Sequence, residues 1–423
     1  MSRSEPNKPI VNKEHLLNDS KTFCMLPWTH LHVTPIGTAA PCCIADSCNN
    51  HVGMGDAKKE RLLDLINSPK MKQLRLDMIN GVPNTECNSC YSHEAHKIKS
   101  WRQTSNEAYE QYFDEVLNTN SDGSLPEFKM RYYDMRFSNI CNFKCRTCSQ
   151  EYSSQWEQEN LRNNVPYALS FTKNTNTELV QDVLDNIEHM DTAYFAGGEP
   201  LIMDQHYVIL EEMIRKGRTD IQLRYNTNAS NLKYKNKDII DLWSRFTKPI
   251  DIAVSIDHVK ERAEYIRHGT DWGTVEKNVK LIRSLPNVAF SVNTVLSVFN
   301  FLTFDQFYQY LMVKEIYNSS CGIYNMTSPY HLSCHVLPPE YKQLGKQSLE
   351  QAIRVIGNNI TDHARNHILE AITWAMSRDI ADEIDPSNTT YMQLFKDEIN
   401  RIDSIRGEDF RKTFPELAPL LDS

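Results

Sequence analysis

Three cysteines, Cys141, Cys145 and Cys148, lie within eight residues of one another in a C-x3-C-x2-C spacing. Three thiolates on one short loop can bind three irons of a four-iron, four-sulfur cluster, which leaves the fourth iron without a protein ligand. An open coordination position distinguishes a reactive metal site from a closed structural one. A zinc site, which would need a fourth ligand nearby, or a group of buried thiols is the alternative. The spacing favours an iron–sulfur cluster.

The sequence around this loop predicts that it follows a buried strand. From residue 131 onward, short runs rich in β-branched and aromatic residues alternate with amphipathic helical stretches, which is typical of βα units around a parallel sheet. Six such units predict an α/β fold with a partial (β/α)6 barrel, two units short of a closed barrel, and place the chemistry at the carboxyl ends of the strands. The predicted strands are 132–137, 192–195, 221–226, 250–256, 289–296 and 322–326.

The cysteine loop, in this strand-to-loop context, resembles the signature of the radical S-adenosylmethionine (SAM) superfamily, and the resemblance covers most of residues 131–330. It implies a [4Fe–4S] cluster whose open iron binds the amino and carboxylate groups of SAM. One electron from the cluster then cleaves SAM to methionine and a 5′-deoxyadenosyl radical, which abstracts a substrate hydrogen. Many members carry an aromatic residue just before the third cysteine; here Thr147 stands there, and Phe143 supplies a nearby aromatic that is a candidate SAM contact.

The second predicted strand ends in Gly197-Gly198-Glu199-Pro200. Two glycines let the backbone approach a ligand closely, and a carboxylate beside them can bind an ammonium group. The resemblance assigns this stretch to the methionine amino group of SAM. An ordinary strand-to-helix turn is the alternative, but the position about fifty residues after the cysteine loop favours a binding role.

Polar residues follow the next two predicted strands: Asn228 after the third, and Ser255 and Asp257 after the fourth. Short polar side chains at strand ends suit ribose hydroxyls, and the resemblance implies contact with the SAM ribose. It also implies that an arginine twelve residues after the serine, here Arg267, binds the SAM carboxylate, a pairing that guanidinium geometry favours. The alternative is that Asn228, Ser255 and Asp257 cap loops and helices.

The N-terminal region contains a C-x12-G-x4-C pattern formed by Cys24, Gly37 and Cys42. It resembles the twitch module, the shortened form of the SPASM domain, which binds an auxiliary iron–sulfur cluster and usually follows the radical SAM domain. Gly37 would turn a hairpin that brings Cys24 near Cys42. Cys43 could replace Cys42, and structural zinc is the alternative to a cluster. The implied ligands are Cys24, Cys42, Cys87 and Cys90.

The bulk composition is that of a soluble globular chain, with 423 residues and a net charge of −9. Nine of the 11 cysteines lie at or before Cys148. Their odd number and clustering, together with a start that lacks a signal-peptide core, argue against a disulfide framework. No transmembrane helix is expected, so we expect a cytoplasmic location. An acidic chain does not favour non-specific nucleic-acid binding.

Five segments are expected: a polar arm over residues 1–20, a twitch-like metal-binding module over 21–100, a linker over 101–130, the partial barrel over 131–335 and a helical extension over 336–423. The leading interpretation is a radical SAM enzyme acting on a peptide, with an auxiliary cluster and a reductant such as flavodoxin or ferredoxin. Nucleoside, RNA or sugar modification by the same chemistry is an alternative. A non-catalytic iron–sulfur or zinc electron-transfer protein is another.

Overall fold

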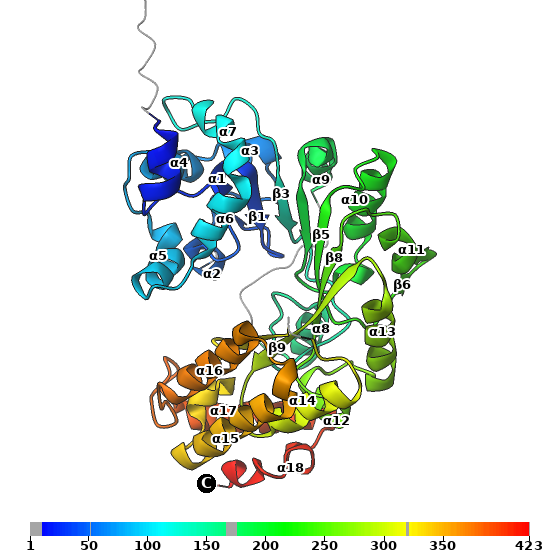
Figure 1. Ribbon diagram of the computed structural model, residues 1–423. Coiled ribbons are helices and arrows are strands. Elements are labelled where there is room, and N and C mark those ends of the chain that lie inside the picture. The colour runs from blue at the N-terminus through cyan, green and yellow to red at the C-terminus, as the bar shows by residue number, and fades with distance from the viewer. Residues whose placement is uncertain (1–10, 51, 166–175, 319–320, 423) are drawn as a thin grey trace, which may run out of the picture. The chain divides into compact units, whose positions relative to one another are not determined.

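The computed structural model describes residues 11–50, 52–165, 176–318 and 321–422. The chain divides into two compact units. Strand β5 (Gln222–Thr227), labelled in Figure 1, begins in the first unit and ends in the second. The first unit comprises 1–139, 167–224 and 241–248, and the second comprises 140–166, 225–240 and 249–423.

The sheet of the first unit runs in the order β5-β4-β3-β1-β2. Strand β3 (Tyr132–Met135) lies between β4 (Thr192–Phe195) and β1 (His30–Val33), and pairs with both in parallel. The short β2 (Ala39–Ala40) returns antiparallel to β1. The cysteine-rich N-terminal region therefore contributes a strand to the same sheet as the first predicted barrel strand, which the sequence patterns did not predict.

Helices surround the N-terminal part of the first unit, and its predicted linker is folded. Within residues 101–130, α6 (Trp101–Tyr109) begins at a capping box of Ser100 and Gln103, and α7 (Asp114–Leu117) follows. Residues 1–10 of the predicted polar arm lie outside the described residues, while a short helix at His15–Asp19 buries Leu16. The other helices are α1 (Leu26–Thr29), α2 (Asp46–Asn50), α3 (Leu62–Ile66), α4 (Pro69–Ile79), α5 (Asn88–Ala95), α9 (Thr177–Asn186) and α10 (Asp204–Arg215).

The second unit contains parallel strands in the order β10-β9-β8, namely β10 (Gly322–Asn325), β9 (Val288–Leu296) and β8 (Ile250–Ser255). Alternate residues of β8 and β9 are fully buried, which is the period-two pattern of strands that pack one face against helices. A small hairpin joins β6 (Lys233–Tyr234) to β7 (Lys237–Asp238), and α11 (Ile239–Trp243) follows it. The remaining helices before the C-terminal extension are α8 (Ser154–Arg162), α12 (Lys260–Ile266), α13 (Trp272–Ser284) and α14 (Phe304–Val313).

The C-terminal extension is helical, as the sequence predicted. It comprises α15 (Pro339–Ile356), α16 (Asp362–Met376), α17 (Tyr391–Arg406) and α18 (Phe410–Thr413). All six predicted strands are present within two residues of their expected bounds, and their pairing is mostly parallel. The α/β class is confirmed. Among the described helices, none has the length and apolar character needed to cross a membrane.

Candidate active site

The cysteine loop leaves β3 and is fixed by backbone hydrogen bonds to the turn after α12. The amide of Lys144 donates to the carbonyl of His268 at 2.9 Å, and the amide of Arg146 donates to the carbonyl of Ile266 at 2.7 Å. Both residues lie between cysteines, so these bonds set the path of the loop.

Gly269 permits the close approach of this turn to the loop. Its φ is +109°, and a Cβ at this position would lie 2.9 Å from the carbonyl oxygen of Asn142 and 2.9 Å from Cδ1 of Phe143. A side chain here would therefore collide with loop backbone and adopt a strained conformation. Phe143 itself is only 2% exposed. The sequence analysis did not select Gly269, although its position two residues after Arg267 was a signal.

The three thiols of the loop differ in exposure. Cys145 is buried, whereas Cys141 and Cys148 are half-buried. Burial raises the pKa of Cys145, and it raises that of Cys148 to about 12; the nearby Arg267 guanidinium opposes both shifts. Without a metal, the thiols of Cys145 and Cys148 are therefore protonated at neutral pH. Metal binding would displace these protons, because the thiolate is the ligand.

Arg267 is engaged in a buried ion pair beside Cys145. Its Nε lies 2.8 Å from Oδ2 of Asp257, and its Nη1 lies 4.0 Å from Sγ of Cys145. Burial alone would lower the pKa of Arg267, but Asp257 more than offsets this and raises it. Asp257 is fully buried, and its Oδ1 also accepts from the amide of Val295 at 2.8 Å. The two predicted SAM contacts are thus brought together with a predicted cluster ligand.

Asn228 also contacts the cysteine loop. Its amide nitrogen donates to Oδ1 of Asn142 at 3.0 Å, and its Oδ1 accepts from the amide of Ser230 at 2.9 Å. These two bonds are of the loop-capping kind that the sequence analysis gave as the alternative for Asn228. One of the partners, Asn142, belongs to the cysteine loop. Ser255 ends β8, is half-buried and pairs in register with Asn293 of β9.

The Gly197-Gly198-Glu199 turn lies in the first unit. Gly197 has a φ of +116°, and a Cβ there would lie 3.3 Å from the side chain of Arg136. Glu199 is 1% exposed, and its Oε1 accepts from the amide of Leu201 at 3.1 Å. This cap begins the short 3-10 helix Pro200–Ile202. The predicted turn is therefore present, and SAM contact by these residues stays a prediction.

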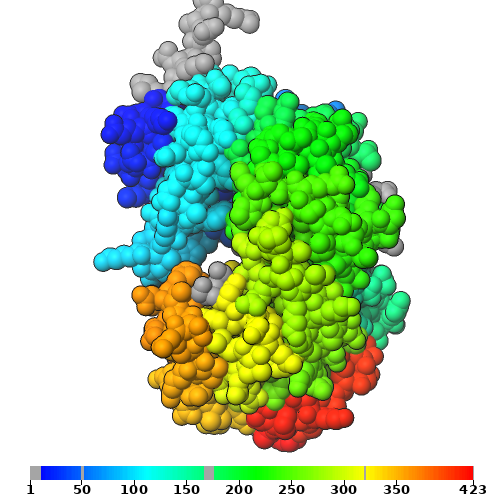
Figure 2. Space-filling view, turned by 45° about the vertical axis from the view of Figure 1, so that its right-hand side comes forward, coloured from blue at the N-terminus to red at the C-terminus, as the bar shows by residue number. Residues whose placement is uncertain are grey.

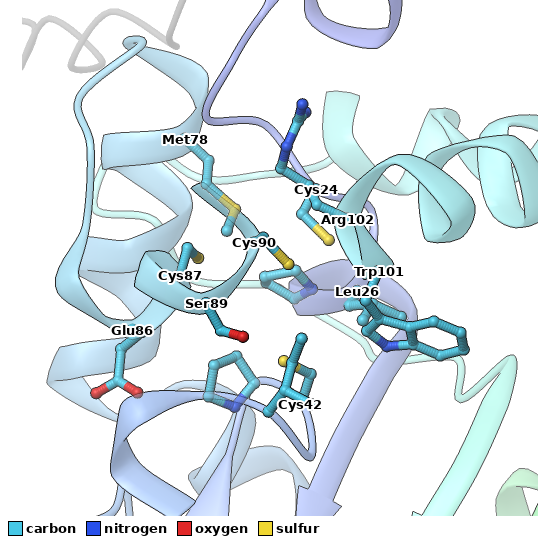
Figure 3. Close-up of a pocket in the computed structure, with 13 residues that line it drawn as sticks. Cys24, Leu26, Cys42, Met78, Glu86, Cys87, Ser89, Cys90, Trp101 and Arg102 are labelled. Carbon is cyan, nitrogen blue, oxygen red and sulfur yellow. The ribbon is translucent and has the colours of Figure 1, made fainter. Parts of the chain in front are cut away.

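Four cysteines from three separate segments line one cavity in the first unit. The hairpin at Gly37, where φ is +89°, returns the chain from β1 to β2 and so leads to Cys42. Figure 3 shows the labelled cysteines around a common space. Cys43 does not line this cavity, so the structure favours Cys42 over its neighbour. The four are Cys24, Cys42, Cys87 and Cys90.

Burial raises the pKa of each of these thiols, and that of Cys87 rises to about 12. Arg102 also lines the cavity, and its positive charge favours the thiolate forms of Cys24 and Cys90. Its guanidinium is fixed by two bonds to Glu94, at 2.9 and 2.7 Å, and by a bond to the carbonyl of Phe23 at 2.8 Å. Four thiols beside a buried cation are a donor set that fits a metal–thiolate group.

Four thiols around one cavity are a donor set that either a zinc ion or an iron–sulfur cluster could use. Structural zinc needs four ligands around one point, with each sulfur about 2.3 Å away. Within the part of the chain that the structure describes, no three cysteine, histidine or carboxylate side chains are grouped around one such point.

A buried polar network that the sequence analysis missed adjoins Cys43. His32 Nδ1 lies 3.0 Å from Oδ2 of Asp134, and Arg136 Nε lies 3.3 Å from the other carboxylate oxygen. Burial alone would raise the pKa of Asp134, but His32 and Arg136 lower it below its usual range. Burial raises the pKa of Cys43 to about 11, with Asp134 as the next cause. The sequence signal for this network was the alternation of polar residues along β1 and along β3.

Comparison with known families agrees with this geometry. Residues 135–311 match the radical SAM superfamily model, and residues 24–91 match the SPASM model, described as an iron–sulfur cluster-binding domain. The chain is therefore a radical SAM protein with a SPASM-type auxiliary module, here on the N-terminal side. These two domains imply a [4Fe–4S] cluster, SAM and an auxiliary iron–sulfur cluster.

Solved structures that this chain matches include anSMEcpe with bound AdoMet and the Cp18Cys peptide, at 17% identity and a TM-score of 0.37, covering 58% of this chain and 66% of that one. Streptococcus suis SuiB bound to S-adenosylmethionine matches at 12% identity and a TM-score of 0.36, covering 71% of this chain and 64% of that one. The chain thus spans slightly less than two thirds of the length of each of these two proteins. A search of curated proteins found no significant match.

Proposed function

We propose that this protein is an enzyme that cleaves SAM reductively and uses the resulting radical on a peptide substrate. A bound cluster would supply the electron for SAM cleavage, and the radical formed from SAM would abstract a substrate hydrogen. The three loop thiols, Cys141, Cys145 and Cys148, would hold this cluster. The observation that carries the proposal is the fixed path of this loop, with Arg267 and Asp257 against its buried central thiol.

The residues around the loop have separate proposed roles. Arg267 would orient the SAM carboxylate with the part of its fork that Asp257 leaves available, because guanidinium presents several donors. Asn228 would hold the cysteine loop in place through its hydrogen bond to Asn142. Ser255 would contact the ribose of SAM. Contact of Gly197, Gly198 and Glu199 with the SAM amino group, and of Phe143 with SAM, is also proposed from the resemblance.

The four cavity cysteines would bind the auxiliary cluster. If all four are ligands, this cluster has no open iron and would serve electron transfer or structure rather than substrate binding. Arg102 would stabilise its negative charge from one side of the cavity. A reductant such as flavodoxin or ferredoxin would supply the electrons.

Iron and sulfide per chain after anaerobic reconstitution test the metal part of this proposal. The wild type is compared with the variant in which Cys141, Cys145 and Cys148 are all alanine. About eight irons falling to about four would support two cubane clusters. About four falling to none, with zinc bound, would make the N-terminal site a structural zinc site.

Deuterium transfer tests the substrate class. The reduced enzyme is incubated with SAM and a peptide digest from cells grown on deuterated amino acids, and 5′-deoxyadenosine is analysed by mass spectrometry. Deuterium in this product would support a peptide substrate. Deuterium only from labelled RNA, nucleosides or sugars would contradict it and favour the alternative substrates.

A further inference from the structure

The C-terminal extension contacts the cysteine loop through buried charges. Arg146 stands between Cys145 and Thr147 and is only 4% exposed. Its Nη2 lies 2.5 Å from Oδ1 of Asp403 and 2.5 Å from Oε2 of Glu408. Its guanidinium also stacks on the ring of Tyr265, 3.7 Å from the centroid. Arg146 is thus neutralised mainly by residues more than 250 positions further along the chain.

A second set of contacts reaches the loop through α8. Arg406 Nη2 lies 2.8 Å from Oε1 of Glu159, which also pairs with Lys144 of the loop. The Arg406 guanidinium lies 4.7 Å above the ring of Trp156, and the indole nitrogen of Trp156 donates to the carbonyl of Cys145 at 2.7 Å. Figure 2 shows the C-terminal residues, in red, next to the blue-green residues of the α8 region.

The same C-terminal residues also contact the turn that fixes the loop backbone. Glu408 Oε1 lies 2.6 Å from Nδ1 of His268, whose carbonyl accepts from Lys144. Asp403 accepts from the hydroxyl of Tyr265 at 2.7 Å and from the amide of Phe410 at 2.7 Å. Three side chains of residues 403–408 therefore reach the loop, the turn and α8 together.

We propose that residues 403–410, the C-terminal contact segment, position the cysteine loop and thereby control retention of its cluster. Asp403, Glu408 and Arg406 are positioning residues, because each acts on the thiols through another side chain. This inference rests on the proposed function in one respect, namely that the three thiols bind the cluster. It goes further by assigning to the helical extension the regulation of that site.

The charges explain why the contact is specific to the loop. A buried arginine without its carboxylates, or a buried carboxylate without its arginine, is an uncompensated charge. Full docking of the C-terminal contact segment on the cysteine loop is therefore strongly preferred over partly docked arrangements. When the C-terminal contact segment undocks, the charge of Arg146 must move toward water. Arg146 directly follows the proposed ligand Cys145 in the chain. Loss of the segment should therefore open the loop before it disturbs β8 and β9.

Hydrogen–deuterium exchange of the full chain tests this inference. Asp403→Asn and Glu408→Gln are compared with wild type, and Asp422→Asn is the matched control. Asp422 is on the same extension, and its pair with Arg411 is exposed and touches neither the loop nor its turn. Exchange of the peptide spanning 141–148 should rise at least ten-fold in the first two variants and stay unchanged in the control. Exchange in β8 and β9 should stay close to wild type.

A selective loss of iron is the second readout. After reconstitution, Asp403→Asn and Glu408→Gln should each lose about half of their iron to a chelator at least five-fold faster than wild type, while the remaining iron leaves at the wild-type rate. Equal rises of exchange in the loop and in β8 and β9, in both variants, would overturn the proposal and leave the segment a general stabiliser. Unchanged loop exchange would also overturn it.

The exchange result does not depend on the proposed chemistry. If the triple-alanine variant kept its iron, the proposed function would fail, yet a selective rise in loop exchange would still show that the segment positions the loop. If the loop exchange were unaffected while the triple-alanine variant lost iron, the positioning role alone would fail. The two failures are therefore distinguishable.

Discussion

Asp257 and Arg267 form a buried ion pair whose Nε–Oδ2 distance is 2.8 Å, and the arginine reaches to within 4.0 Å of Sγ of Cys145. Ten residues separate the two in sequence, and α12 between them returns the chain so that they meet. The carboxylate is fully buried and the arginine side chain is 15% exposed, so the carboxylate depends on the arginine for charge compensation.

Breaking this pair should be costly. Asp257→Asn leaves the guanidinium without its carboxylate, and we expect the free energy of unfolding to fall by about 3 kcal/mol or more. The double variant Asp257→Asn/Arg267→Met should recover part of this loss, because it removes the stranded charge. Denaturant unfolding measures both. As a control, Asp422→Asn breaks an exposed pair and should cost less than about 1 kcal/mol.

The cavity assigns different roles to two adjacent cysteines. Cys42→Ala should remove about four irons per chain from the reconstituted protein, because Cys42 lines the cavity. Cys43→Ala is the matched control and should keep its iron, because Cys43 adjoins Asp134 and Arg136 instead. Iron analysis after gel filtration measures the difference. The opposite pattern would make Cys43 the ligand.

Cys145 is the buried thiol of the loop. Cys145→Ala should abolish release of 5′-deoxyadenosine from SAM under a strong reductant while leaving about four irons bound in the N-terminal module. Product analysis by chromatography, with iron measured on the same sample, provides the check. Residual SAM cleavage at more than a few per cent of the wild-type rate would contradict the assignment.

Gly269 should be intolerant of substitution. Gly269→Ala combines a strained positive φ with contacts of 2.9 Å to Asn142 and Phe143, so we expect a loss of about 3 kcal/mol and a faster loss of loop iron. Gly217→Ala is the control, since Gly217 also has positive φ but a Cβ there meets nothing within 4 Å. It should cost about 1 kcal/mol. Similar losses for both variants would exclude close packing as the cause.

His258 should make the fold sensitive to acid. Its Nδ1 accepts from the amide of Val259 at 2.9 Å and its Nε2 lies 3.1 Å from the hydroxyl of Thr303, so the buried ring is neutral. Burial, with Arg262 as the next cause, lowers its pKa to about 3. The unfolded chain binds a proton near pH 6.5 that the folded chain resists, so stability is full above that pH and falls as pH drops toward 3.

From pH 7 to pH 5, this one histidine should reduce the free energy of unfolding by about 2 kcal/mol. Denaturant unfolding at the two pH values measures the loss. The variant His258→Asn lacks the titrating ring and should lose correspondingly less between pH 7 and pH 5, whatever its stability at pH 7. An equal loss in the variant would contradict a neutral buried His258.

Local patterns were sufficient to predict the strands. Runs of β-branched and aromatic residues can be recognised in the sequence without knowledge of their partners, so the strand bounds were predicted within two residues. Asp257 and Arg267 were predicted as SAM contacts from the strand-end position of Asp257 and from the family resemblance, which implies an arginine twelve residues after Ser255. Their mutual ion pair was not, because a side chain's partner depends on how α12 returns the chain.

The sequence by itself determined the chemistry of this protein, because thiol type and spacing within eight residues are local properties. Only the tertiary structure decided which distant groups support those thiols. It placed Asp403 against Arg146 across 257 residues, joined β1 to β3, and turned Cys42 rather than Cys43 into the cavity. Such contacts follow from packing and charge compensation between segments, and no local pattern along the chain encodes them.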